Sequence, residues 1–203
     1  DRPTRGTVHE IRGKETVLAV HALRSLRETC TYKNLEIIAV LDSETKPSAR
    51  NEIMAACGNN FKIVEYDREF NFAEKVNLGV VQSDGDYILL LNDDTEIISS
   101  DTIETLMGLL EDPEVAMAGP ILLYEDGTIQ SAGHILNPIP YDLYRHRSPE
   151  HVGAQNMLRV QREVSGIIAA CVLIKRTAFM EVGGLCTLFP SNYNDVDFGL
   201  KLR

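Results

Sequence analysis

The chain lacks an excess of positive charge and any apolar run long enough to cross a membrane. Its 20 Lys and Arg residues against 30 Asp and Glu give a formal charge of −10. A negative field argues against nonspecific nucleic-acid binding and against an anionic membrane surface as the main partner. No apolar run approaches the roughly 20 residues of a membrane-spanning helix. An anionic substrate would therefore need a cation, or local Arg and Lys side chains, to offset the field.

Closely spaced cysteine pairs are also lacking. The four cysteines, Cys30, Cys57, Cys171 and Cys186, form no C-x-x-C pair. Cys57 falls in a helical pattern and Cys171 in an apolar strand, where thiols behave as small core side chains. We expect reduced thiols and a cytoplasmic location. Attachment to the inner face of the membrane would have to come from parts outside this sequence.

The composition is that of a globular protein, with 44% hydrophobic and 25% charged residues among 203. In the first half, strand patterns at 35–41, 61–66 and 87–91 alternate with helical patterns. The helical patterns cover 15–30, 47–57 and 72–82. Such alternation predicts βαβ units with a mainly parallel sheet, and hence an α/β fold.

The pattern changes after Thr95. Apolar residues on both sides of Glu125-Asp126-Gly127 predict a hairpin, and residues 134–162 show little periodicity, as in a surface excursion. We expect one domain over 1–203, with a nucleotide-sugar half at 1–95 and an acceptor-side half at 96–203. Residues 1–6 resemble a loop that follows an absent strand, and the last helix stops at Arg203. We therefore expect a fragment without its first strand and C-terminal part.

The most informative stretch is an apolar strand, Tyr87 to Leu91, that runs directly into Asn92, Asp93 and Asp94. Open parallel sheets place ligands at the carboxyl ends of their strands. Adjacent carboxylates repel each other and resist desolvation unless a cation joins them. The pattern indicates a site for a hard divalent cation and the anion that it neutralises. The alternative is a simple turn, which Asn and Asp also favour.

Further motifs follow in a characteristic order along almost the whole chain. They are Pro3-Thr4-Arg5-Gly6, Leu35 to Asp42, Phe70-Asn71-Phe72-Ala73 with Asn77, Leu89 to Thr95, Gly119-Pro120 with Asp126-Gly127, Ala132-Gly133, Gly183-Gly184-Leu185 and Asn194-Asp195-Val196-Asp197. In this order the chain resembles the family 2 glycosyltransferases, and among them bacterial rhamnosyl- and galactofuranosyl-type enzymes. The resemblance implies a GT-A fold, which is a Rossmann-like three-layer sandwich with a small antiparallel extension.

The resemblance also implies a reaction and its donor site. The expected enzyme moves a sugar, with inversion, from a nucleoside-diphosphate sugar to a hydroxyl of a glycan or lipid-linked acceptor, using Mg²⁺ or Mn²⁺. Thr4 and Arg5 would lie beside the nucleotide, and Asp42 would meet its base. Asn77 would contact the donor or, alternatively, a loop backbone.

Asn92, Asp93 and Asp94 correspond to the Asp-x-Asp motif of this family. Asp94 would be the metal ligand, and Asn92 and Asp93 would contact the donor. Asn92 departs from the usual acid. Because the metal would stabilise the departing diphosphate, no general acid is required.

Asp195 corresponds to the general base that takes the acceptor proton, with Asn194 and Asp197 in supporting roles. The competing interpretation is structural: Asn194 caps a helix, and Asp195 and Asp197 favour its first turn. Cys186-Thr187 departs from the acidic pair expected after Gly-Gly. Acceptor choice would depend on residues 134–162 and on the absent C-terminal part.

Two other functions fit parts of the sequence. A sugar-nucleotide nucleotidyltransferase would also use acidic metal ligands, but it should carry a Gly-rich basic loop, for which Arg5-Gly6 is a poor substitute. A non-catalytic nucleotide- or glycan-binding domain fits the Asn at position 92.

Overall fold

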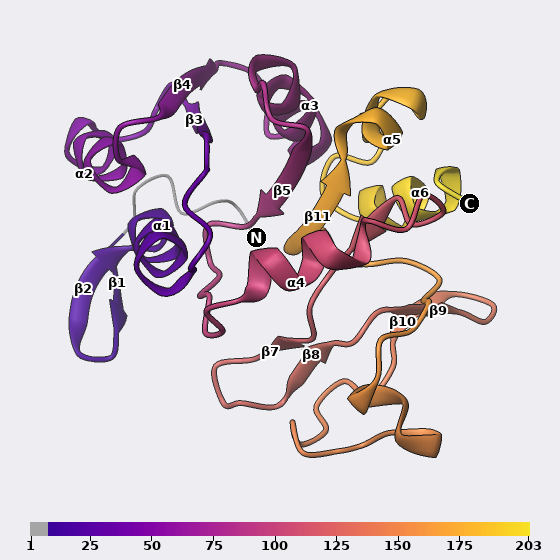
Figure 1. Cartoon of the computed structure of the whole chain (residues 1–203). Coiled ribbons are helices and arrows are strands. Elements are labelled where there is room, and N and C mark those ends of the chain that lie inside the picture. The colour runs from indigo at the N-terminus through magenta and orange to yellow at the C-terminus, as the bar shows by residue number, and fades with distance from the viewer. Residues whose placement is uncertain (1–7) are drawn as a thin grey trace.

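The structure is a computed structural model, and it describes residues 8–203 (Figure 1). It begins with an antiparallel hairpin of β1 (Val8–Ile11) and β2 (Lys14–Val17), joined by a two-residue turn. Both turn residues, Arg12 and Gly13, have positive φ angles of 50° and 77°, as tight hairpin turns require. The helix predicted from residue 15 therefore begins later, as α1 (Leu18–Thr29). Strand pairing with β1 holds residues 15–17 extended.

A βαβ unit follows as predicted. β3 (Ile37–Asp42) and β4 (Phe61–Tyr66) pair in parallel, and α2 (Pro47–Cys57) connects them. Pro47 occupies the first helical turn, where its missing N–H costs nothing. Gly58 ends the helix with a φ of 85°.

The strand that carries the acidic motif lies in a second ladder. α3 (Phe72–Gln82) leads into β5 (Tyr87–Leu91), which pairs antiparallel with β11 (Cys171–Lys175). β11 also pairs antiparallel with β6 (Met117–Ala118), and Figure 1 shows β5 and β11 side by side. The described strands thus form a parallel pair, β3–β4, and a separate antiparallel ladder of β5, β11 and β6, so the antiparallel share is larger than in the expected mainly parallel sheet.

The remaining elements are α4 (Thr102–Leu109), β7 (Leu122–Leu123), β8 (Ile129–Ser131), β9 (His134–Leu136), β10 (Pro140–Asp142), a 3₁₀ segment η1 (Ala154–Arg159), α5 (Arg176–Glu181) and α6 (Asn194–Lys201). They include two short hairpins that lie beyond α4 (Figure 1). The hairpin predicted around Glu125-Asp126-Gly127 is confirmed as β7–β8. The surface excursion contains the β9–β10 hairpin and the 3₁₀ segment.

β3 is covered on both faces, because its side chains point alternately toward two layers of helices. Ile37, Ala39 and Leu41 pack in one cluster with α1 and α2. The intervening residues face α3, which approaches so closely that a Cβ at Gly79 would lie 3.1 Å from a Val40 methyl group. The glycine therefore permits this helix–strand distance.

β5 shows the same alternation. Ile88 and Leu90 share a cluster with residues of α3, α5 and α6, whereas Leu89 packs in clusters with α4. Both faces of the sheet are covered, so the predicted three-layer α/β arrangement is confirmed. This double burial explains why the strand reads as a continuous apolar run.

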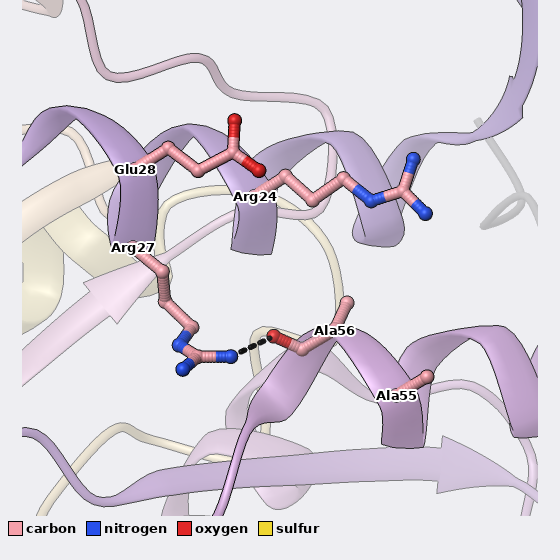
Figure 2. A pocket seen from close by; sticks show the side chains of 5 residues that line it. All are labelled: Arg24, Arg27, Glu28, Ala55 and Ala56. Carbon is pink, nitrogen blue, oxygen red and sulfur yellow. Dashed lines mark hydrogen bonds between the residues drawn. The ribbon is translucent and has the colours of Figure 1, made fainter.

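The end of α2 is fastened to α1 by an arginine (Figure 2). Arg27 donates from Nη1 to the carbonyl oxygen of Ala56 at 3.2 Å. A Cβ at Gly58 would lie 2.5 Å from the guanidinium carbon. Arg24 extends in another direction, and the hollow of about 330 Å³ here contains none of the predicted site residues.

The thiols behave as expected for core cysteines. All four are free, and Cys30, Cys57 and Cys171 are buried. Burial, followed by the neighbouring Cys30, raises the pKa of Cys171 to about 11. Within residues 8–203, every helix is too short or too polar to cross a bilayer.

Candidate functional site at the end of β5

The chain turns sharply where β5 ends. The Asn92 amide donates to the Ala170 carbonyl at 2.9 Å, and the Thr95 hydroxyl donates to the Asn92 carbonyl at 2.7 Å. These bonds fix the backbone of Asn92 and leave Asp93 and Asp94 exposed at the strand end. The backbone after β5 therefore forms the turn that was the alternative interpretation. The carboxylates of Asp93 and Asp94 remain at the surface.

The charge of Asp94 is unfavourable in this position. Partial desolvation raises the pKa of Asp94, and the nearby negative charge of Asp93 raises it further, against a smaller lowering by its own backbone amide. A bound cation would offset both the desolvation of Asp94 and its repulsion from Asp93. No set of three or more His, Cys, Asp or Glu side chains gathers as a metal site within the described part of the chain. Two carboxylates nevertheless suit Mg²⁺, which takes its other ligands from substrate phosphates and water.

Asp195 lies in the first turn of α6, and one carboxylate oxygen reaches the sheet. Its Oδ2 accepts from the Ala169 amide at 3.4 Å, and its Oδ1 accepts from the Val196 amide at 2.8 Å. Because Asn92 is bonded to Ala170, the acidic motif and Asp195 attach to two consecutive residues just before β11. Segments about 100 positions apart in sequence therefore meet at one edge of the sheet.

The capping role considered for Asn194 is wrong. α6 begins at Asn194, and the residue before it, Tyr193, has left-handed φ and ψ of 62° and 2°. The buried Asn194 amide instead donates to the Phe189 carbonyl at 3.3 Å. Asp197 forms an ion pair with Lys201 at 2.7 Å, one turn along the helix. Asn194 is thus bound to the preceding loop, and Asp197 pairs within α6.

Asp42 lies at the end of β3, as predicted, and it is 8% exposed. Its Oδ1 accepts a hydrogen bond from Lys75 Nζ at 3.0 Å, which compensates the buried charge. The Lys75 ammonium also lies 5.6 Å from the centre of the Tyr66 ring. Contact of Asp42 with a nucleotide base stays a prediction. Thr4 and Arg5 lie outside the described residues.

The side-chain amide of Asn77 forms two hydrogen bonds with the backbone of a single residue, Leu185. Asn77 Nδ2 donates to the Leu185 carbonyl at 2.8 Å, and the Leu185 amide donates to Asn77 Oδ1 at 2.9 Å. A Cβ at Gly184 would lie 2.6 Å from Asn77 Oδ1, so the glycine makes room for this clamp. The geometry favours the loop-backbone alternative for Asn77 over the donor contact.

Asn71 and Phe72 also hold this loop, although no local sequence signal indicated that role. Asn71 Oδ1 accepts from the Glu74 amide at 3.1 Å and caps α3, while its Nδ2 donates to the Thr187 carbonyl at 2.9 Å. The Phe72 amide donates to the Pro190 carbonyl at 2.8 Å. An Asn before an apolar helix signals the cap, but its second partner is 116 residues away.

A second hollow, of about 490 Å³, lies on the β7–β8 hairpin. Tyr124, Glu125, Asp126 and His146 line it, and the Tyr124 and His146 rings stack with centroids 4.8 Å apart. None of the predicted site residues lines this hollow. The predicted site is therefore an open edge of the sheet, separate from this hollow.

Comparison with known proteins gives consistent similarities. The family model Glycosyl transferase family 2 matches residues 15–183. An uncharacterized protein, y4gI of Sinorhizobium fredii (strain NBRC 101917 / NGR234), is 31% identical over 177 residues, which are 85% of this chain and 20% of the relative. The O-antigen biosynthesis protein RfbC of Myxococcus xanthus is 26% identical over 182 residues, 88% of this chain and 14% of the relative.

The fold also matches a solved structure. It is the mannosyltransferase PcManGT from Pyrobaculum calidifontis, in complex with GDP-Man and Mn²⁺. The TM-score is 0.61 at 15% identity, over 88% of this chain and 48% of that one. The predicted GT-A fold is confirmed by this likeness. The chain spans a fifth or less of the length of the curated relatives that it matches.

Asp94→Asn should stabilise the metal-free protein near neutral pH. The raised pKa means that the ionised carboxylate costs free energy in the folded state. This cost develops as pH rises through the unfolded-state pKa of about 3.9 and is complete above the folded-state pKa. Thermal melts should show a higher Tm for the variant at pH 7, converging with wild type toward pH 3. The exposed Asp67→Asn should leave the Tm unchanged, and a lower Tm for Asp94→Asn at pH 7 would contradict the assignment.

Asn77→Ala should release the Gly184–Leu185 segment. The change leaves the amide and carbonyl of Leu185 without their partners, which costs about 1–3 kcal/mol for each buried group. Denaturant unfolding should show the lost stability, and hydrogen exchange should show faster exchange at Leu185. Asn51→Ala on the exposed side of α2 is the matched control. Equal exchange at Leu185 in both variants would mean that the clamp does not hold the loop.

Proposed function

Because the chain belongs to glycosyltransferase family 2, we propose that it transfers a glycosyl group from a nucleoside-diphosphate sugar to a hydroxyl of a glycan or lipid-linked acceptor. The main support is the shared attachment of the acidic motif and Asp195 to Ala169-Ala170. A donor held at one motif and a base at the other would then face the same reacting carbon. The four free thiols suit a reducing, cytoplasmic compartment.

On the donor side, Asp94 would hold Mg²⁺ or Mn²⁺, with Asn92 and Asp93 beside the nucleotide sugar. The metal would supply charge stabilisation for the departing diphosphate. The raised pKa of Asp94 supports this, because two close negative charges favour a cation. The similar mannosyltransferase was solved in complex with GDP-Man and Mn²⁺, which supports the same ligand classes for this chain.

On the acceptor side, Asp195 would remove the proton of the attacking hydroxyl. The hydroxyl oxygen forms a bond to the anomeric carbon while the bond from that carbon to the diphosphate oxygen breaks. Attack from the face opposite the leaving group inverts the configuration, as in inverting glycosidases with a single base. The amides of Ala169 and Val196 orient the Asp195 carboxylate for this role.

A domain that binds its ligands without turnover is the second candidate. It is favoured by one observation, the uncharged Asn at position 92, whose backbone is bonded to Ala170. This candidate predicts nucleotide binding without chemistry. The nucleotidyltransferase alternative has no comparable support, because the family match concerns glycosyl transfer.

Calorimetric titration with UDP, GDP and dTDP should detect one nucleotide whose binding requires Mn²⁺ or Mg²⁺. Asp94→Asn should remove the metal dependence, because it removes the ligand charge. Asp67→Asn should bind as wild type does. If no nucleotide binds the full protein with either metal, the donor site is wrong.

Asp195→Asn should lower transfer by roughly 10²–10⁴-fold, the usual contribution of a general base. Nucleotide affinity and Tm should stay near wild type, because the amide can still accept from Ala169. Asp86→Asn, at the opposite end of β5, is the control and should transfer normally. Transfer by Asp195→Asn at nearly the wild-type rate would remove Asp195 from catalysis, and binding without turnover in wild type would favour the second candidate.

A further inference from the structure

The loop before α6 displays large apolar side chains to solvent. Leu188 is 85% exposed, Tyr193 is 59% exposed and Phe189 is 37% exposed. Single exposed apolar residues are ordinary on protein surfaces. Three within six positions, shortly before Asp195, give this loop an unusual share of exposed apolar surface close to the proposed base.

This loop is firmly held despite its exposed side chains. Its backbone is bonded by Asn77 at Leu185, by Asn71 at Thr187 and by the Phe72 amide at Pro190. Asn194 adds a further bond to the Phe189 carbonyl. Leu188 and Tyr193 are therefore presented by a fixed backbone, which lowers the entropy lost when a ligand binds.

Tyr193 combines exposure with an unusual backbone. Its φ of 62° lies in the left-handed region, which a bulky side chain adopts only at a cost. The side chain forms no hydrogen bond or ring contact with any described residue. Its Cα lies within about 7 Å of the Cα of Asp195, because two residues cannot span more. The strained residue thus carries an exposed aromatic ring two positions before the proposed base.

We propose that Tyr193, extended by Leu188, is the surface on which the acceptor sugar rests while its hydroxyl meets Asp195. A tyrosine ring offers a flat apolar face to the C–H face of a pyranose and a hydroxyl at its edge. This inference rests on the proposed function. It assigns acceptor contact to the loop at 187–193 in addition to the surface excursion at 134–162.

The test compares variants of the full protein with the donor identified by calorimetry. The acceptor probes are the methyl glycosides of glucose, mannose, galactose and rhamnose. Tyr193→Ala removes the ring, and Tyr193→Gly removes the ring while also relieving the backbone. Tyr193→Phe keeps the ring. Tyr87→Ala, at an exposed tyrosine where β5 begins and therefore at the end of the strand away from the proposed site, is the matched control.

Tyr193→Ala and Tyr193→Gly should each raise the KM for the best probe about tenfold, as expected for loss of one aromatic contact. Donor hydrolysis without acceptor, the nucleotide Kd and kcat should stay near wild type. Tyr193→Phe and Tyr87→Ala should keep the wild-type KM. A purely structural role would instead change the Tm and leave the KM of Tyr193→Gly unchanged.

Three outcomes would overturn the proposal. The first is an unchanged KM in both ring-deleted variants, and the second is a raised KM in Tyr87→Ala alone. The third is a wild-type protein that hydrolyses the donor but glycosylates none of the four probes. Failure of donor hydrolysis in wild type would reject the proposed function itself, so the two failures are distinguishable.

Discussion

The arrangement of the site depends on the two residues that precede β11. The Ala170 carbonyl accepts from Asn92, and the Ala169 amide donates to Asp195. Because β11 runs antiparallel to β5, its start lies at the end of β5. If β11 ran parallel to β5, the residues that follow β11, and not those that precede it, would lie at the end of β5. The reversal of β11 therefore lets α6 place a carboxylate beside the acidic motif.

α3 supplies the second constraint. One helix holds Asp42 through Lys75, and it holds the loop before α6 through Asn71, Phe72 and Asn77. Its apolar side packs with β5, β11, α5 and α6 in one cluster. Packing of this helix thus fixes three things together: the end of β3, the sheet face and the entry into α6.

Sequence patterns predicted the elements that depend on local periodicity and missed those that depend on distant partners. The run from Tyr87 to Leu91 and the helix from Pro47 to Cys57 were predictable, because burial on two faces and a helical start leave local signals. Residues 15–17 were misassigned, because pairing with β1 overrides their helical pattern. Asn194 is a residue type that often caps helices, but its side-chain amide donates to the Phe189 carbonyl instead. The acidic motif was identifiable, whereas its proximity to Asp195 required the fold.

The electrostatics of the site follow from these constraints. The chain carries a formal charge of −10, and Asp42 and Asp94, at the ends of β3 and β5, lie in different electrostatic surroundings. Lys75 compensates the buried carboxylate of Asp42, whereas partial desolvation, followed by the charge of Asp93, raises the pKa of Asp94. A permanent ion pair at Asp94 would lower that cost and would also compete with a metal ion. The raised pKa of Asp94 in the free protein therefore supports the proposal that a cation, with an anionic donor bound to it, neutralises this edge.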